Sequence, residues 1–470
     1  MSHELPLTIK DAAAALRTGT LTSVELTTGI LKKTSKLNEA LGTYVTVTEE
    51  SALEAATAAD KAFAEGVDAG PLQGIPLAVK DIIATRDAPT TANSRVLDPE
   101  WGKDVDAPVV ARLREAGAVF VGKSTTSEFA CGMPDPDKGF LIPRNSWNLD
   151  HTPGGSSAGT GNGVSAGLAL GGLGTDTGGS VRFPAAMNGH TGLKVTFGRV
   201  PKNGVVPLGY TLDSVGPMAR SAYDCALLLE VMAGYDPGDV YAAKVEVPAY
   251  TEALTGSVEG TRIGVPMPYF FDVDGLDDEV RAGVLAAVDV LKEAGAAVAE
   301  TEIPYAKQAK VANSVTMAAE AYSYHRDNLV HRWTDYGCHT RITIGRGALF
   351  SAADYWQAQR FRTLFCRKVA EVFSSCDVIV TPTWAKPAPR SDEMSAESMI
   401  HSPSFTGPWN LTGLPAVAVP CGFSSSGLPI SMQIVGKPFA EATVLRVADA
   451  YQRATDWHLR VPPIASQLDA

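Results

Sequence analysis

A chain of 470 residues, with 45% hydrophobic and 20% charged residues, has the composition of a folded globular protein and excludes long disordered regions. The net charge is −12 and no stretch is rich in Lys or Arg, which argues against nucleic acid or an anionic membrane as a partner, because both need a basic surface. No apolar run of about 18 residues and no secretion signal are visible, so we predict a cytoplasmic protein.

The first 65 residues are predicted to form a helical layer. Two segments resemble the capping boxes that begin helices, Thr8-x-x-Asp11 and Thr22-x-x-Glu25. A third helix is expected at about 49–64, followed by an apolar strand at 75–79 that leads into Lys80. A helix and a buried strand then follow one another within residues 106–123, which is typical of an α/β fold.

Residues 131–163 are predicted to form a polar loop rich in Gly, Pro, Ser and Asn, and a loop of this length inside a domain is commonly functional. After residue 222, helices are expected at about 222–233, 277–293, 308–332 and 352–374, and strands at 262–265, 378–381, 416–419 and 430–435. No repeat or linker divides the chain. We therefore predict one large α/β domain, with residues 1–65 as its N-terminal helical layer and residues 66–470 as its α/β part.

Two segments rich in glycine and serine, 154–159 and 174–180, are candidates for chemistry. Glycines beside a serine allow sharp turns that expose its hydroxyl, and consecutive glycines can aim backbone N–H groups at one point, as an oxyanion hole requires. A serine nucleophile also needs a base, and a lysine kept neutral by burial can serve. Lys80, at the end of an apolar strand, is such a lysine, while His151 and His190 are the nearest histidines in sequence.

The same segments resemble those of the amidase signature family. The matching residues are Gly74-Ile75-Pro76-Leu77-Ala78-Val79-Lys80-Asp81, Gly154-Gly155-Ser156-Ser157 and Asp176-Thr177-Gly178-Gly179-Ser180, in the family's order and close to its spacing. Further matches lie at 184–185, 192–194, 213–217, 410–415 and 427–429, so the resemblance covers nearly the whole chain. It implies an α/β/α fold in which helices cover both faces of a mixed central sheet.

The resemblance also implies a role for each matching residue. Ser180 would be the nucleophile, and Ser156, which follows a cis Gly155–Ser156 peptide in the family, would pass the proton to neutral Lys80. The oxyanion would be held by the backbone N–H groups of Thr177, Gly178, Gly179 and Ser180. Gly155, Asp176 and Arg182 would support these groups, and Gly132 and Met133 match positions that line the acyl pocket. The family needs no cofactor or metal, and none of the six cysteines or eight histidines here has zinc-site spacing.

The predicted activity is that of a hydrolase of carbon–nitrogen bonds other than peptide bonds, acting on linear amides through an acyl-enzyme. We expect aryl or alkyl amides as substrates, with esters and carbamates (urethanes) as further candidates. The expected partners are a small-molecule amide and water, with no nucleic acid and no membrane, and the chain is expected to be a monomer or homodimer.

Three alternatives remain. The first is the glutaminase (A-type) subunit of a tRNA-dependent amidotransferase, whose pattern differs from this chain at residues 128–140 and 198–201. The second is a non-catalytic binding relative, which the complete set of Lys80, Ser156 and Ser180 disfavours. The third takes residues 155–159 as the G-x-S-x-G turn of an α/β-hydrolase, with Ser157 as nucleophile and a histidine as base, but the preceding residues do not resemble a strand.

Overall fold

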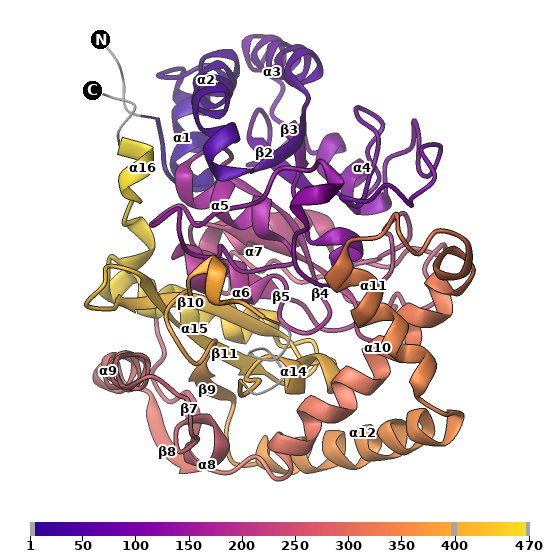
Figure 1. Cartoon of the computed structure of the whole chain (residues 1–470). Coiled ribbons are helices and arrows are strands. Elements are labelled where there is room, and N and C mark those ends of the chain that lie inside the picture. The colour runs from indigo at the N-terminus through magenta and orange to yellow at the C-terminus, as the bar shows by residue number, and fades with distance from the viewer. Residues whose placement is uncertain (1–4, 396–401, 467–470) are drawn as a thin grey trace.

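The structure is a computed structural model that describes residues 5–395 and 402–466 (Figure 1). One mixed sheet of 11 strands runs through the molecule in the order β1-β3-β2-β4-β6-β5-β10-β11-β9-β7-β8. The strands are β1 (Tyr44–Val47), β2 (Pro76–Lys80), β3 (Val119–Ser124), β4 (Gly171–Asp176), β5 (Thr191–Lys194), β6 (Ser214–Ala219), β7 (Arg262–Pro266), β8 (Ala297–Thr301), β9 (Val378–Pro382), β10 (Ala416–Phe423) and β11 (Pro429–Gly436).

The sheet joins an N-terminal half to a C-terminal half. Strands β2, β3 and β4 are parallel neighbours, and β4 continues antiparallel to β6 and then β5. Strand β10 pairs antiparallel with β5 and so connects the two halves, which separate by colour in Figure 1. Because β2, β3 and β4 are parallel, the residues that end or follow them (Lys80, Ser124 and Thr177) come to the same edge of the sheet.

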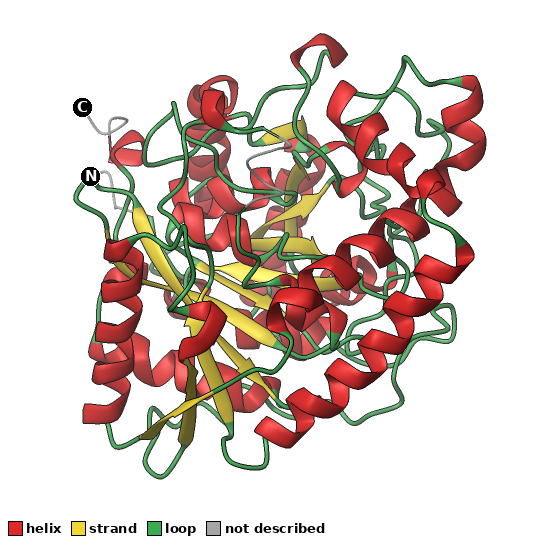
Figure 2. Ribbon diagram, turned by 60° about the horizontal axis from the view of Figure 1, so that its bottom comes forward, coloured by secondary structure: helices red, strands yellow, loops and turns green. Residues whose placement is uncertain are grey.

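Helices cover both faces of the sheet (Figure 2). They are α1 (Ile9–Thr18), α2 (Ser23–Leu41), α3 (Glu49–Ala64), α4 (Pro108–Glu115), α5 (Ala158–Ala166), α6 (Arg182–Asn188), α7 (Ala222–Met232), α8 (Met267–Phe270), α9 (Asp278–Glu293), α10 (Ala306–His331), α11 (Cys338–Gly345), α12 (Ala352–Val372), α14 (Gly407–Leu411), α15 (Glu441–Ala454) and α16 (Pro463–Ser466). Helices α5 and α6 pack on each other, and α15 packs on both α7 and α9. The predicted α/β/α fold is confirmed.

Most long helices begin and end within two residues of their predicted positions. Thr22 caps α2 in a complete capping box with Glu25, as expected. The short elements β1, β4, β5, β6, α5 and α6 were not predicted. Strand β4 and helix α5 are rich in glycine because neighbouring backbones come close, and a Cβ at Gly172 would lie 2.6 Å from the carbonyl oxygen of Ala78. Glycine hides the β-strand pattern that branched side chains would show.

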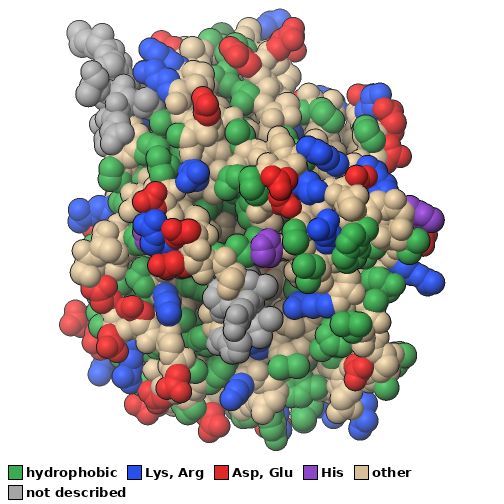
Figure 3. Space-filling view, viewed as in Figure 1, with side chains coloured by type: hydrophobic (Ala, Val, Ile, Leu, Met, Phe, Trp, Pro, Cys, Tyr) green, Lys and Arg blue, Asp and Glu red, His purple; other side chains and the backbone are tan. Residues whose placement is uncertain are grey.

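The surface in Figure 3 mixes charges of both signs. On this face Lys and Arg side chains alternate with Asp and Glu, and no large area has a single sign. Across residues 5–395 and 402–466, no helix combines the length and apolar character needed to span a membrane.

Candidate active site

Lys80 is the last residue of β2 and is completely buried. Its Nζ donates hydrogen bonds to Ser156 Oγ and to Thr175 Oγ1, both at 2.7 Å. Burial lowers the pKa of Lys80 to about 7, although the negative charges of Asp213 and Asp176 oppose that shift. A lysine with this pKa is partly neutral near physiological pH and can accept a proton.

Ser156 lies two residues before α5 and follows a cis peptide bond from Gly155. Only 4% of Ser156 is exposed. Its carbonyl oxygen accepts a hydrogen bond of 3.1 Å from the backbone N–H of Ser127, in the segment that follows β3. This hydrogen bond fixes the backbone that carries the hydroxyl in contact with Lys80.

Ser180 follows β4 and is partly exposed. Its carbonyl oxygen accepts a hydrogen bond of 3.2 Å from the backbone N–H of Ser157, so Ser180 lies beside the residue after Ser156. Within the described part of the chain, no hydrogen bond holds the Ser180 hydroxyl. The three residues predicted to react therefore lie together, with Lys80 and Ser156 in direct contact and Ser180 free to turn.

Two carbonyl groups, those of Asp176 and Gly178, fix the backbone on either side of Thr177. The carbonyl oxygen of Asp176 accepts from Asn410 Nδ2 at 3.1 Å, and that of Gly178 accepts from Thr406 Oγ1 at 2.6 Å. In a trans peptide unit the C=O and the following N–H point in opposite directions. The N–H of Thr177 is therefore directed away from Asn410.

Gly179 differs from the other predicted oxyanion donors. Its N–H donates to Asp176 Oδ1 at 2.8 Å, whereas the N–H groups of Thr177, Gly178 and Ser180 have no acceptor among residues 5–395 and 402–466 and can bind an oxyanion. Gly179 has a φ of 136°, and a Cβ there would lie 2.6 Å from Thr406 Oγ1 and from the ring of Phe183. Only glycine fits this turn without strain.

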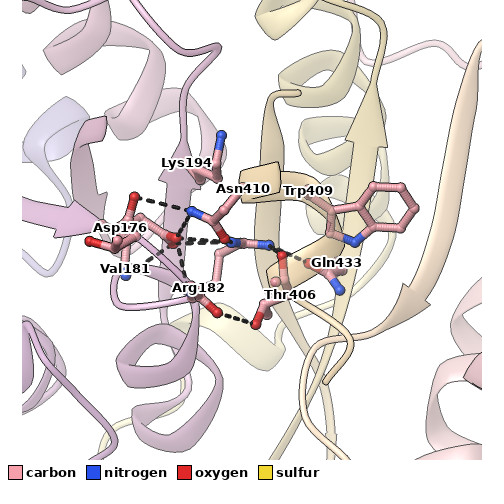
Figure 4. A network of polar contacts seen from close by, with 12 residues as sticks. Asp176, Val181, Arg182, Lys194, Thr406, Trp409, Asn410 and Gln433 are labelled. Carbon is pink, nitrogen blue, oxygen red and sulfur yellow. Dashed lines mark hydrogen bonds and ion pairs between the residues drawn. The ribbon is translucent and has the colours of Figure 1, made fainter. Parts of the chain in front are cut away.

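Asp176 and Arg182 form a fully buried ion pair that joins the two halves of the sheet (Figure 4). Arg182 donates to Asp176 Oδ1 at 2.9 Å and Oδ2 at 3.0 Å. The rest of its guanidinium donates to side chains or backbone of the C-terminal half, namely Asn410, Gln433 and Thr406.

The charge on Asp176 is well stabilised. Burial on its own would raise the pKa of this carboxyl, but Arg182, Lys194 and Asn410 outweigh it and lower the pKa to about 2. Asp176 therefore stays ionised and holds the backbone N–H groups of Gly179 and Val181. It orients the loop that carries Ser180 without touching the Ser180 hydroxyl.

Gly132 and Met133 lie in the segment after β3. Gly132 has a φ of 71°, and a Cβ there would come within 2.9 Å of Thr340 Oγ1, on α11. Met133 lines a small cavity together with Asn93, Thr126, Glu128, Phe140 and Leu141, and none of the three predicted reacting residues lines that cavity.

The histidines and the second serine have other contacts. His151 Nδ1 lies 2.6 Å from the carbonyl oxygen of Ala388, and His190 is buried next to the carbonyl of Thr191, where burial lowers its pKa to about 4. Ser157 is completely buried, and its Oγ bonds to the backbone of Thr175. This arrangement offers no histidine base to Ser157 and argues against the α/β-hydrolase alternative.

Asp81, the neighbour of Lys80 in sequence, points elsewhere. Its carboxylate pairs with Lys123 at 3.2 Å and accepts from the Thr91 hydroxyl. It therefore does not oppose the low pKa of Lys80, and the opposing charges come from Asp213 and Asp176 instead.

Four residues in contact with the site were not predicted to have a role: Thr175, Thr406, Asn410 and Gln433. Asn410 stands inside a segment that resembles the family, and Thr175 lies in the glycine-rich segment 174–180 directly before matching residues, which were the available signals. Thr406 and Gln433 carry no local pattern, because the chain returns to the site from more than 200 residues away.

Comparison with known proteins decides the family. The amidase family model matches residues 25–445. The chain belongs to the amidase signature family. A relative from Roseiflexus sp. (strain RS-1), named as the A-type subunit of glutamyl-tRNA(Gln) amidotransferase, is 42% identical over 97% of this chain and 98% of its own.

Two solved amidase signature structures are also similar. The A-type subunit of glutamyl-tRNA(Gln) amidotransferase from Thermotoga maritima is 31% identical with a TM-score of 0.81, covering 96% of both chains. The peptide amidase from Stenotrophomonas maltophilia is 28% identical with a TM-score of 0.81, covering 96% of this chain and 98% of its own. The family assigns this chain to the hydrolases that act on carbon–nitrogen bonds.

These relatives correct the prediction about partners. We expected a monomer or homodimer that acts alone on a small-molecule amide without any nucleic acid. That prediction is contradicted by full-length similarity to proteins named as one subunit of an amidotransferase for glutamyl-tRNA(Gln). The error came from giving weight to two short segments, 128–140 and 198–201, whereas the similarity extends over 97% of the chain.

Proposed function

We propose that the chain is the glutaminase (A-type) subunit of a tRNA-dependent amidotransferase and hydrolyses the side-chain amide of glutamine through an acyl-enzyme on Ser180. The observation that carries this proposal is the 42% identity over 97% of the chain to a protein named as the A-type subunit of such an enzyme. One subunit of a larger assembly need not itself carry the basic surface that binds tRNA. We place the protein in the cytoplasm.

Lys80 is the base in this mechanism. When Lys80 is neutral, its lone pair accepts the proton of the Ser156 hydroxyl, while an N–H of the amine still donates to Thr175. Ser180 turns its hydroxyl toward Ser156 and gives up its proton as its Oγ attacks the amide carbon. The contact of 2.7 Å between Lys80 and Ser156 supports this route.

The same groups complete the reaction. The N–H groups of Thr177, Gly178 and Ser180 stabilise the negative oxygen of the tetrahedral intermediate. Lys80 then returns its proton through Ser156 to the leaving nitrogen, so that ammonia departs and Ser180 remains acylated. A water molecule releases glutamate through the same relay, and no cofactor or metal takes part.

Release of ammonia from glutamine and from the aliphatic amide, and of aniline from the anilide, tests the proposal. We expect the wild-type chain, assayed alone and with its partner subunits, to prefer glutamine over a primary aliphatic amide and an anilide. Ser180→Ala should remove activity on all three amides. Preference for the anilide, without stimulation by partners, would contradict the glutaminase proposal while leaving Ser180 as the nucleophile.

A second candidate substrate class is alkyl or aryl amides, with carbamates and esters beside them. Two aromatic rings, those of Phe183 and Trp384, lie next to the loop that carries Ser180 and favour this class. The ring of Phe183 closes on Gly179 and stacks edge-to-face on Trp384, with ring centroids 4.9 Å apart. An apolar acyl or amine group could pack on these rings. The same comparison of glutamine, the aliphatic amide and the anilide distinguishes the two classes.

A further inference from the structure

Asp213 is a buried carboxylate to which the proposed mechanism gives no role. It directly precedes β6, the antiparallel neighbour of β4, and the two strands meet where Ser214 pairs with Asp176. Its oxygens accept hydrogen bonds from Thr177 Oγ1 at 2.5 Å, from the N–H of Leu208 at 3.0 Å and from the N–H of Gly209 at 3.0 and 3.1 Å. Over the described residues it forms no ion pair.

Thr177 connects this carboxylate to the oxyanion loop. Its backbone N–H is one of the donors that remain free for an oxyanion, and its hydroxyl is bound to Asp213. The next residue, Gly178, is held from the other side by Thr406. Thr177 and its N–H are therefore positioned by Asp213, across the strand pair β4–β6.

Several charged or titratable groups face Asp213: Lys80 from β2, Lys202 and Tyr210 from the segment between β5 and β6, and Glu320 from α10. Burial raises the pKa of Asp213 to about 6, three hydrogen-bonding partners lower it, and the charge of Glu320 raises it. The charge of Asp213 also raises the pKa of Lys80, against the effect of burial, and does so more than the charge of Asp176.

We propose that Asp213 is a positioning residue of the active site, whose ionised carboxylate holds Thr177 in the oxyanion loop and places a negative charge near Lys80. The proposal rests on the proposed role of Ser180 as nucleophile. It assigns two separable effects to one carboxylate, one of geometry and one of charge.

The test measures how fast Ser180 reacts with phenylmethylsulfonyl fluoride between pH 5 and 9, followed by mass spectrometry. This reaction requires an activated serine and no amide substrate. In Asp213→Asn the rate at high pH should fall about tenfold, because an amide NH2 group replaces one of the two oxygens that accept from Thr177, Leu208 and Gly209. The rise of rate with pH should also move about one pH unit lower, because protonated Lys80 loses a stabilising charge.

Two other variants separate these effects. Thr177→Val removes the hydroxyl and keeps the charge of Asp213, so the rate should fall without a shift to lower pH, and Thr177→Ser should restore it. Asp224→Asn is the matched control. Asp224 is also fully buried with a pKa raised by burial to about 6, but it accepts from the backbone of Lys10, where α1 meets α7. It should leave both rate and pH dependence unchanged.

Each outcome decides the proposal. An Asp213→Asn profile that matches wild type and Asp224→Asn would overturn it. If Asp213→Asn does not fold, equal rates for Thr177→Val and Thr177→Ser would overturn it instead. A wild-type Ser180 that does not react at any pH would contradict the proposed function itself, and with it any role for Asp213 in that function.

Discussion

Lys80 and Lys194 are equally buried but differ in their partners. Both side chains are 0% exposed, and burial lowers the pKa of each to about 7. Lys80 donates to two hydroxyl groups, whereas Lys194 donates to the backbone carbonyl oxygens of Val195 and Leu414. A hydroxyl can give a proton to a neutral amine and a carbonyl cannot. Burial therefore supplies basicity, and the partner decides whether a lysine can act as a base.

The surroundings of the two lysines also differ. Lys194 ends β5, and the positive charge of Arg182 further lowers its pKa; both residues are drawn in Figure 4. Negative charges raise the pKa of both lysines: Asp213 and Asp176 act on Lys80, and Asp176 and Glu441 act on Lys194. Lys194 connects the end of β5 to the backbone carbonyl of Leu414, just before β10, and both of its partners are carbonyl groups that have no proton to give. The comparison predicts that only Lys80 contributes to catalysis.

Replacing each lysine by methionine tests this comparison and has the largest expected effect. Lys80→Met should lower kcat/KM for amide hydrolysis by about 10⁴-fold, because Ser180 loses its base. Lys194→Met should lower it by no more than about tenfold, and should cost about 1–3 kcal/mol of stability for each carbonyl left without a partner. Ammonia release and thermal unfolding measure the two quantities. Equal losses of activity would remove the distinction between the two lysines.

The ion pair between Asp176 and Arg182 is expected to matter next. Asp176→Asn should lower the free energy of unfolding by about 3–5 kcal/mol, because Arg182 then keeps a buried charge without its partner. Denaturant unfolding at neutral pH measures it. The exposed pair Arg390–Asp392 offers a control, since Asp392→Asn should leave the free energy of unfolding nearly unchanged. A similar cost for both variants would show that burial adds nothing.

The pH dependence of activity and of stability also distinguishes Lys80 from Lys194. Activity requires neutral Lys80, so kcat/KM should rise as pH increases through about 7 and then level off, in wild type and in Lys194→Met alike. The folded pKa of both lysines lies below the unfolded value of about 10.4, so the unfolded chain binds more protons between pH 7 and 10. Stability should therefore rise with pH in that window, less steeply in Lys194→Met. A kcat/KM that falls with pH would contradict the lysine base.

Thr175 is expected to have the smallest effect. Thr175→Val removes one of the two hydroxyl partners of Lys80 and should lower kcat about tenfold, because Lys80 is then held only by Ser156. Thr175→Ser keeps the hydroxyl and should remain close to wild type. Steady-state kinetics on the best amide substrate measures both, and unchanged kinetics in Thr175→Val would show that Ser156 alone orients the lysine.

Some of the site could be predicted because its signal is local. Ser180 and Ser156 are flanked by glycines, and Lys80 ends an apolar strand, so residue type and neighbours indicated their chemistry before any contact was known. The long helices were predicted for the same reason, since their apolar period lies within one segment. The prediction about partners failed because it gave weight to two short segments, 128–140 and 198–201, whereas the similarity to the relatives extends over 97% of the chain.

The sequence by itself determined the family and the α/β class, and it predicted which residues react, because these depend on short patterns and on the burial of apolar runs. Only the tertiary structure decided which buried lysine meets a hydroxyl, that the Gly179 N–H is directed at Asp176, and that Asn410 and Gln433 reach Arg182 across the sheet. These contacts join residues up to 251 positions apart. Their energies depend on distance and on exclusion of water, which are properties of the packed chain and of no single segment.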